Sequence, residues 1–236
     1  VLHRLAIASK DGDWILREDS EALEHVLGVL ARRGAQYRFG APLDLHWMSG
    51  GWSAHFEFRQ ANLRVRTDFF TRPPRVGSEE LARMWIEQEG CDPPFTSARI
   101  LAEMKKTDRE KDYPFIGELA RRMKDSRDRL LYSRSPDDLV ELARCDPDLV
   151  DDLSADRPLL ASVGLGRRVL AEALQLEMLD LMERNEARLA EYRKASSAWA
   201  ELWPALASEL EEMPLRAAHA LLSARAAGML PGKLTP

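Results

Sequence analysis

Two adjacent prolines, Pro73 and Pro74, divide this 236-residue chain into parts with different sequence patterns. A proline has no backbone N–H to give to a strand ladder, so a sheet cannot continue through this pair. Before the prolines, alternating apolar and polar residues, as in the run from His55 to Phe58, predict strands. After them, apolar residues recur at helical spacing almost to the end of the chain. The sequence therefore predicts a small module containing a sheet, followed by a helical region.

The first part is expected to hold one helix, at residues 20–33, which ends at Gly34. The turns between strands are expected at Gly50-Gly51 and at residues 60–62. Strands are predicted at residues 13–17, 36–39, 43–48, 53–59 and 63–70.

After residue 76 the predicted helices are 78–88, 96–106, 113–124, 136–144, 167–194, 198–211 and 215–227. Pro204 is expected to kink or divide the sixth of these helices. The predicted fold class is α+β, with a sheet-containing module in residues 1–76 and a helical domain in residues 77–236.

Composition limits the functional classes. Hydrophobic residues at 45% and charged residues at 31% are typical of a soluble globular protein. A net charge of −5 argues against electrostatic binding of duplex nucleic acid over a broad surface. Cys91 and Cys145 are too few for a disulfide framework or a cysteine-based zinc site, which favours a cytoplasmic location. No apolar stretch approaches the roughly 20 residues of a membrane span. Because the first residue is Val1 and not Met, the chain is expected to begin inside a longer natural product.

Three aspartates are the candidate metal ligands. Asp11 and Asp13 flank Gly12 at the start of a predicted strand, where residues two apart project to the same side. Asp68 lies inside another predicted strand, and pairing of the two strands would bring the three carboxylates together. Like charges this close require a cation such as Mg²⁺ or Mn²⁺. The alternative is that Asp11 and Asp13 lie in an exposed loop and Asp68 is a surface residue.

Basic residues near these acids could bind phosphate. Arg64 and Arg66 share a strand face with Asp68, so either could instead be its salt-bridge partner. The charged run 105–112 lies between two predicted helices and is open to three interpretations. A lysine there could reach a triphosphate, Asp112 could cap the following helix, or the run could be a solvated surface segment.

The same residues resemble those of a known family. Ser9 to Leu16 resembles the T-K-D-x-D-hydrophobic segment of polymerase-β-like nucleotidyltransferases, and Asp68 resembles the third carboxylate of that superfamily. Residues 105–112, with the apolar positions that follow them, resemble the K…R-x-K-D element of small bacterial members, including the abortive-infection toxin type. The three matches occur in the expected order and cover roughly the first 125 residues.

The resemblance implies transfer of a nucleoside monophosphate from a nucleoside triphosphate to a hydroxyl acceptor, with Mg²⁺ or Mn²⁺ as cofactor. It also implies a mixed sheet with flanking helices in the first module, and it implies that residues 96–124 pack on this module. The acceptor would be a protein, a transfer RNA or a small molecule, and an antitoxin protein is a further implied partner. Asp68 would also help to deprotonate the acceptor, which makes it the catalytic residue. The implied metal ligands are Asp11, Asp13 and Asp68. The implied phosphate contacts are Lys10, Arg66, Lys105, Arg109 and Lys111.

Two departures from the family pattern concern glycines. The family carries a Gly-Gly or Gly-Ser turn about ten residues before the paired acids, and here that place falls at or before Val1. Gly12 stands where the family usually has an apolar residue.

Other classes of function were also considered. A catalytically inactive member of the same fold would act as a nucleotide sensor or a protein-binding module. Hydrolase chemistry has little support, because Ser53 shows no recognisable nucleophile elbow and no base nearby. His46 and His55 are expected on adjacent strands, from which they could approach the acidic site.

Overall fold

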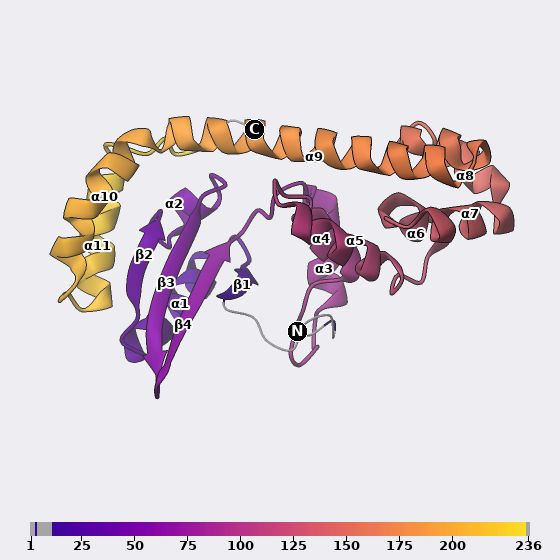
Figure 1. The fold of residues 1–236 in the computed structure, drawn as a ribbon. Coiled ribbons are helices and arrows are strands. Elements are labelled where there is room, and N and C mark those ends of the chain that lie inside the picture. The colour runs from indigo at the N-terminus through magenta and orange to yellow at the C-terminus, as the bar shows by residue number, and fades with distance from the viewer. Residues whose placement is uncertain (1–2, 4–10, 235–236) are drawn as a thin grey trace. The chain divides into compact units, whose positions relative to one another are not determined.

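The computed structural model describes residue 3 and residues 11–234, and the chain divides into two compact units (Figure 1). The sheet unit is made of Ala8–Pro73 and Arg188–Pro236, and the helical unit of Val1–Ile7 and Pro74–Ala187. The break between Pro73 and Pro74 therefore coincides with a unit boundary, as expected from two residues that cannot extend a sheet.

Four strands form one mixed sheet within the described residues: β1 (Asp11–Ile15), β2 (Gln36–Gly40), β3 (Ser53–Gln60) and β4 (Leu63–Phe70). Their order in the sheet is β1-β4-β3-β2, with β1 parallel to β4 and the other neighbours antiparallel. The predicted α+β class with a mixed sheet is confirmed. The predicted turn after residue 60 is also confirmed, because Ala61 and Asn62 connect β3 directly to β4.

The predicted strand at residues 43–48 is wrong. This segment contains the short helix α2 (Leu45–Met48), and the side chain of Asp44 accepts a hydrogen bond from the backbone N–H of Trp47 at 3.2 Å. Trp47 and Met48 are buried in the core, so the apolar residues that suggested a strand face the interior from a helix. A short apolar run does not distinguish a strand from a helix, and here the N-terminal cap by Asp44 favours the helix.

One face of the sheet forms the core of the sheet unit. Ala54 and Phe56 on β3 and Phe69 on β4 are almost fully buried, at alternate positions of their strands. They share one hydrophobic cluster with Leu23 and Leu27 of α1 (Ser20–Arg32). Alternation with period two therefore leaves the polar residues of β3 and β4 on the opposite face.

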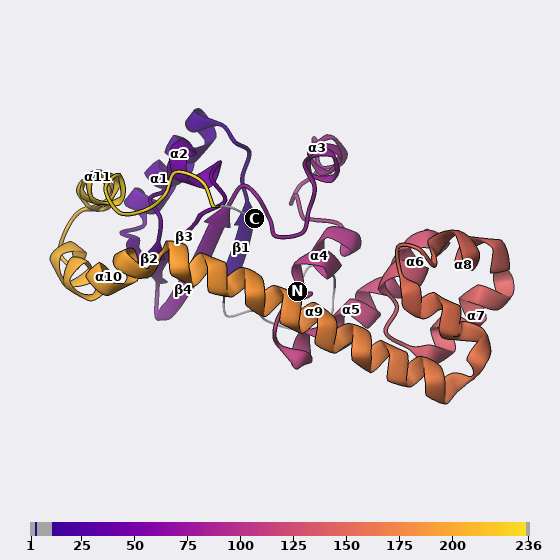
Figure 2. The ribbon, with the colours of Figure 1, turned by 90° about the horizontal axis from the view of Figure 1, so that it is seen from above.

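The C-terminal helices α10 (Ser197–Leu210) and α11 (Leu215–Ala226) belong to the sheet unit and lie beside β2 (Figure 2). Leu222 is fully buried in the same cluster as the sheet residues, and the indole of Trp199 donates a hydrogen bond to the carbonyl oxygen of Gly40 at 3.0 Å. The units therefore differ from the predicted division, which placed all of residues 77–236 in a helical domain. The apolar face of a four-stranded sheet needs cover that α1 alone does not supply, and the cover comes from helices distant in sequence.

The helical unit contains more helices than the sequence predicted. α6 (Ser126–Tyr132) and α8 (Pro147–Leu153) were missed, although Asp125 and Asp146 cap their first turns. The long helix α9 (Arg167–Ala195) contributes residues to both units. No helix in residues 11–234 has the length and apolar character to cross a membrane. The remaining elements are α3 (Ser78–Glu87), α4 (Ala98–Met104), α5 (Tyr113–Ala120), α7 (Pro136–Cys145) and the 3₁₀ helices η1 (Glu110–Asp112) and η2 (Pro158–Leu165).

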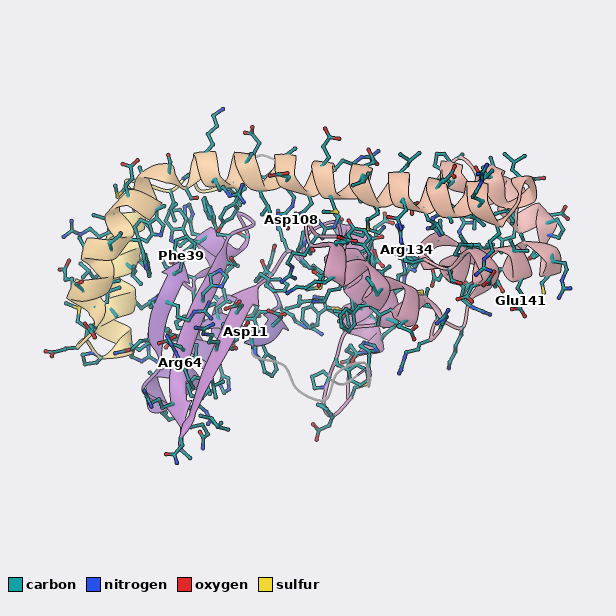
Figure 3. All side chains as sticks on the ribbon, in the orientation of Figure 1. Asp11, Phe39, Arg64, Asp108, Arg134 and Glu141 are labelled. Carbon is teal, nitrogen blue, oxygen red and sulfur yellow. The ribbon has the colours of Figure 1, made fainter. Side chains whose placement is uncertain are left out.

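A buried ion cluster connects the segments of the helical unit. Arg157, which is 4% exposed, forms two hydrogen bonds of 2.8 Å with the carboxylate of Glu177 and also donates to the carbonyl oxygen of Ser133 at 2.9 Å. Arg134, labelled in Figure 3, pairs with the same carboxylate. Burial raises the pKa of Glu177, but the hydrogen bond and charge of Arg157 and the charge of Arg134 outweigh it, so the net pKa is below its ordinary value. Glu177 is therefore ionised and neutralises buried positive charge.

Leu222→Ala tests whether α11 is part of the sheet unit. We expect the substitution to lower the free energy of unfolding by about 2–5 kcal/mol, because it leaves a cavity among the sheet residues. Tryptophan fluorescence during urea unfolding reports this unit, since every tryptophan except Trp85 belongs to it. Leu63→Ala is the matched control, because Leu63 is 71% exposed and should change stability by less than about 0.5 kcal/mol. Equal small effects of the two substitutions would contradict the assignment of α11 to this core.

Glu177→Gln tests the buried ion cluster and its pH dependence. Removing the carboxylate leaves Arg134 and Arg157 without their counter-charge, so we expect a loss of about 3–5 kcal/mol at pH 7. Because the pKa of Glu177 is lowered in the fold, its contribution is complete above the ordinary value of 4.5 and is lost as pH falls through the lowered value. Unfolding followed by circular dichroism should therefore show a gap between wild type and variant that narrows on acidification. Glu172→Gln, at an exposed position of α9, is the control, and a gap that widens at low pH would refute the account.

Candidate active site

The three predicted acids lie on the polar face of the sheet. Asp13 and Asp68 are direct partners in the parallel pair β1–β4, and Asp11 is opposite Arg66 in the same register. Partners in a parallel pair project to the same face, and residues two apart on one strand do so as well. The fold therefore brings Asp11, Asp13, Asp68 and Arg66 onto one surface, and Figure 3 labels Asp11 on this sheet. Their functional roles stay predictions.

The side chains that face Asp68 come from β3 and β2. His55 is the partner of Asp68 across the β3–β4 pair, with its Nδ1 2.9 Å from Oδ1 of the carboxylate. Nη1 of Arg38 lies 3.9 Å from Oδ1 of Asp68 and 3.9 Å from Oδ1 of Asp11. Among the described residues, Oδ1 of Asp68 and Nη1 of Arg38 are buried atoms that make no contact with the geometry of a hydrogen bond.

From the sequence, two other cations, Arg64 and Arg66, are candidate salt-bridge partners of Asp68. Arg64, which Figure 3 labels, pairs instead with Glu57, with contacts of 2.6–2.9 Å. Arg38 was missed because β2 carries a bulge between Tyr37 and Phe39, which shifts its register against β3. A bulge breaks the simple alternation of faces, so parity along the strand does not show where Arg38 points. His46 was predicted on a strand next to His55, but it lies on α2.

Ser53 has a base within hydrogen-bonding distance, contrary to the prediction from the sequence. Its Oγ is 2.9 Å from Nε2 of His55, two residues further along β3. It also hydrogen-bonds with the hydroxyl of Tyr192, whose pKa is raised by burial. The period of two along a strand was the available signal, because it places residues 53 and 55 side by side on one face.

The basic segment 105–112 belongs to the helical unit. Arg109 forms a 2.6 Å ion pair with Asp112, which is 4% exposed and also accepts a 2.7 Å hydrogen bond from the hydroxyl of Thr107. The side chain of Asp112 thus holds its own loop together. Lys105 follows the last turn of α4 and is half-buried, and Lys111 is exposed. The predicted phosphate contact Lys10 lies outside the described residues.

Carboxylate oxygens are the donor atoms that this face of the sheet offers to a cation. Three carboxylates lie at neighbouring register positions, and one buried oxygen, Oδ1 of Asp68, has hydrogen-bonding capacity that the described residues do not use. Mg²⁺ and Mn²⁺ prefer such oxygen ligands. As the side chains stand, no group of three His, Cys, Asp or Glu residues within 11–234 has the geometry of a metal site.

Comparison with known proteins adds no family to this description. Neither a scan against protein-family models nor searches of curated proteins and of solved structures finds a match for the chain. The functional interpretation therefore depends on the chemistry of the residues on the polar face of the sheet.

Proposed function

We propose that this protein is a metal-dependent nucleotidyltransferase, which moves a nucleoside monophosphate from a nucleoside triphosphate to a hydroxyl acceptor. The observation that carries the proposal is the pairing of Asp13 with Asp68 in parallel strands, with Asp11 two residues away on the same face. Carboxylates so close together repel one another unless positive charge lies between them. Arg38 supplies part of that charge, and a substrate–metal complex would supply the rest.

Asp11, Asp13 and Asp68 would hold Mg²⁺ or Mn²⁺. When bound, the ion neutralises the charge of the triphosphate and polarises the phosphorus that is attacked. Their arrangement on adjacent strands of a rigid sheet fixes the backbone positions of the ligands before the nucleotide binds.

Two arginines on the sheet, Arg38 and Arg66, are proposed phosphate contacts. Nη1 of Arg38 is a buried donor without a hydrogen-bond partner among the described residues, so it can donate to a phosphate oxygen without first breaking another hydrogen bond. Arg66 lies opposite Asp11 in the β1–β4 pair and presents a second guanidinium on the same face. Lys10, Lys105, Arg109 and Lys111 stay proposed phosphate contacts on the strength of the sequence pattern alone.

Asp68 is the proposed base that helps to remove the proton of the acceptor hydroxyl. A carboxylate oxygen without a hydrogen-bond donor among the described residues has a lone pair available for this purpose. We keep protein, transfer RNA and small molecule as acceptor classes, with an antitoxin as a proposed protein partner and the cytoplasm as the proposed location. The net charge of −5 favours an acceptor that needs no large nucleic-acid footprint.

Asp68→Asn tests the proposed chemistry. The amide keeps the shape of the side chain but removes its charge and its basicity, so we expect transfer from an α-labelled triphosphate to fall about 100-fold or more. The assay uses the full chain with Mg²⁺, the four nucleoside triphosphates and cell lysate as the source of acceptors. Glu57→Gln is the matched control, because it removes another carboxylate from the same sheet face, and it should retain activity. Undiminished transfer by a correctly folded Asp68→Asn protein would rule out the mechanism.

Arg38→Gln tests nucleotide binding separately from transfer. Loss of a charge-assisted hydrogen bond worth about 1.5–3 kcal/mol should weaken Mg²⁺–triphosphate binding about 10- to 150-fold in calorimetry. Arg59→Gln, an exposed arginine near the end of β3, is the control and should bind normally. Tight nucleotide binding by the wild type with no transferred group detectable by mass spectrometry would instead indicate an inactive nucleotide sensor.

A further inference from the structure

Three side chains on the polar face of the sheet lie in a row that links a hydroxyl to a carboxylate. Oγ of Ser53 is 2.9 Å from Nε2 of His55, and Nδ1 of the same ring is 2.9 Å from Oδ1 of Asp68. A proton on Nδ1, the ring nitrogen beside the carboxylate, would leave the lone pair of Nε2 facing Ser53. This order of hydroxyl, imidazole and carboxylate is the one that activates a serine for nucleophilic attack.

The sheet fixes this row. Ser53 and His55 are two residues apart on β3, so both project to the face that carries Asp68. His55 and Asp68 are register partners across the antiparallel β3–β4 pair, which holds the ring and the carboxylate side by side. The three side chains are all partly exposed and can be reached by a bound substrate.

Next to the row lies a group that can bind the electrophile. Nη1 of Arg38, a buried donor that makes no hydrogen bond to any described residue, is 3.9 Å from the oxygen of Asp68 that His55 contacts. A guanidinium in this position matches the oxygens of a phosphate ester. The electrophile that suits the site is therefore a phosphorus centre that carries negative charge.

We propose that Ser53 is a nucleophilic serine that itself accepts the nucleotidyl group, so that the protein carries a seryl phosphodiester at this position. Oγ of Ser53 forms a bond to the α-phosphorus, and the bond from that phosphorus to the leaving pyrophosphate oxygen breaks. The electron pair of the broken bond leaves with pyrophosphate, and the proton of Ser53 passes to Nε2 of His55. With Ser53 as the acceptor, Asp68 acts through His55, because its carboxylate stabilises the positive charge that develops on the ring. Because the electrophile comes from the function proposed above, this step rests on that function.

A purely structural role predicts different behaviour for Ser53. The hydroxyl also bonds with Tyr192, and in that role it would only tie the end of α9 to β3. A structural serine has ordinary reactivity toward phosphorus electrophiles, whereas an activated serine reacts rapidly and depends on its histidine.

A fluorophosphonate probe tests the nucleophile without metal or nucleotide. The full chain is treated with the probe in the presence of a chelator, and the modified residue is located by peptide mass spectrometry. We expect labelling at Ser53, loss of that label in Ser53→Ala, and labelling on the order of 100-fold slower in His55→Asn. Ser208→Ala is the matched control, because Ser208 is an exposed serine on α10 that bonds to a backbone carbonyl oxygen, and it should label like the wild type. Absence of label at Ser53 in folded wild-type protein would overturn its role as a nucleophile.

A second measurement tests whether Ser53 accepts the nucleotide. Wild-type protein is incubated with an α-labelled triphosphate and Mg²⁺ but no added acceptor, and we expect a nucleoside monophosphate on the Ser53 peptide together with released pyrophosphate. If lysate acceptors become nucleotidylated while Ser53 never carries a nucleotide, this inference fails and the proposed function stands. If the probe labels Ser53 but no transfer occurs to any acceptor, the proposed function fails and the acceptor role of Ser53 fails with it.

Discussion

The pairing of β1 with β4 is the constraint on which the proposed site depends. It places Asp13 directly beside Asp68 and Asp11 beside Arg66, on the sheet face opposite the hydrophobic core. A shift of one residue in this register would turn the acids of β1 toward the other face of the sheet. The β1–β4 register therefore determines both the position of β1 and the residues that form the proposed site. Arg38 then partly balances the negative charge, which lets the carboxylates remain close together.

The helices that pack on the apolar face of this sheet come from both sequence segments of the sheet unit. Residues of α1, close to the strands in sequence, and of α11, near the end of the chain, share one core with Phe56 and Phe69. Trp199 adds a hydrogen bond to the last residue of β2, on the strand that carries Arg38. Packing on the apolar face therefore positions the strands that carry the polar face, and this links the stability of the C-terminal helices to the geometry of the site.

Local patterns predicted most of the elements, because alternation and helical spacing are properties of short segments. The two predicted strands that carry Asp68 and His55 appear with nearly their expected bounds, and the proline pair marks a real boundary. Contacts between segments that are far apart in the chain could not be predicted from these local patterns. The β2 bulge next to Arg38, which contacts Asp68, occurs in the pairing of β2 with β3. The packing of α11 in the core of the sheet unit likewise depends on contacts between segments that are far apart in the sequence. The contact between Ser53 and His55 could have been predicted, because residues two apart on a strand project to the same face.

The central claim is that the carboxylates of β1 and β4 together hold a divalent cation. The most direct test is a titration of Mn²⁺ into the protein with a non-hydrolysable nucleotide, followed by electron paramagnetic resonance. Compared with the wild type, Asp13→Asn should lose most of the bound Mn²⁺ signal, while Glu57→Gln should keep it, because Glu57 lies on the same face but pairs with Arg64. Equal Mn²⁺ binding by the wild type and Asp13→Asn would contradict the account.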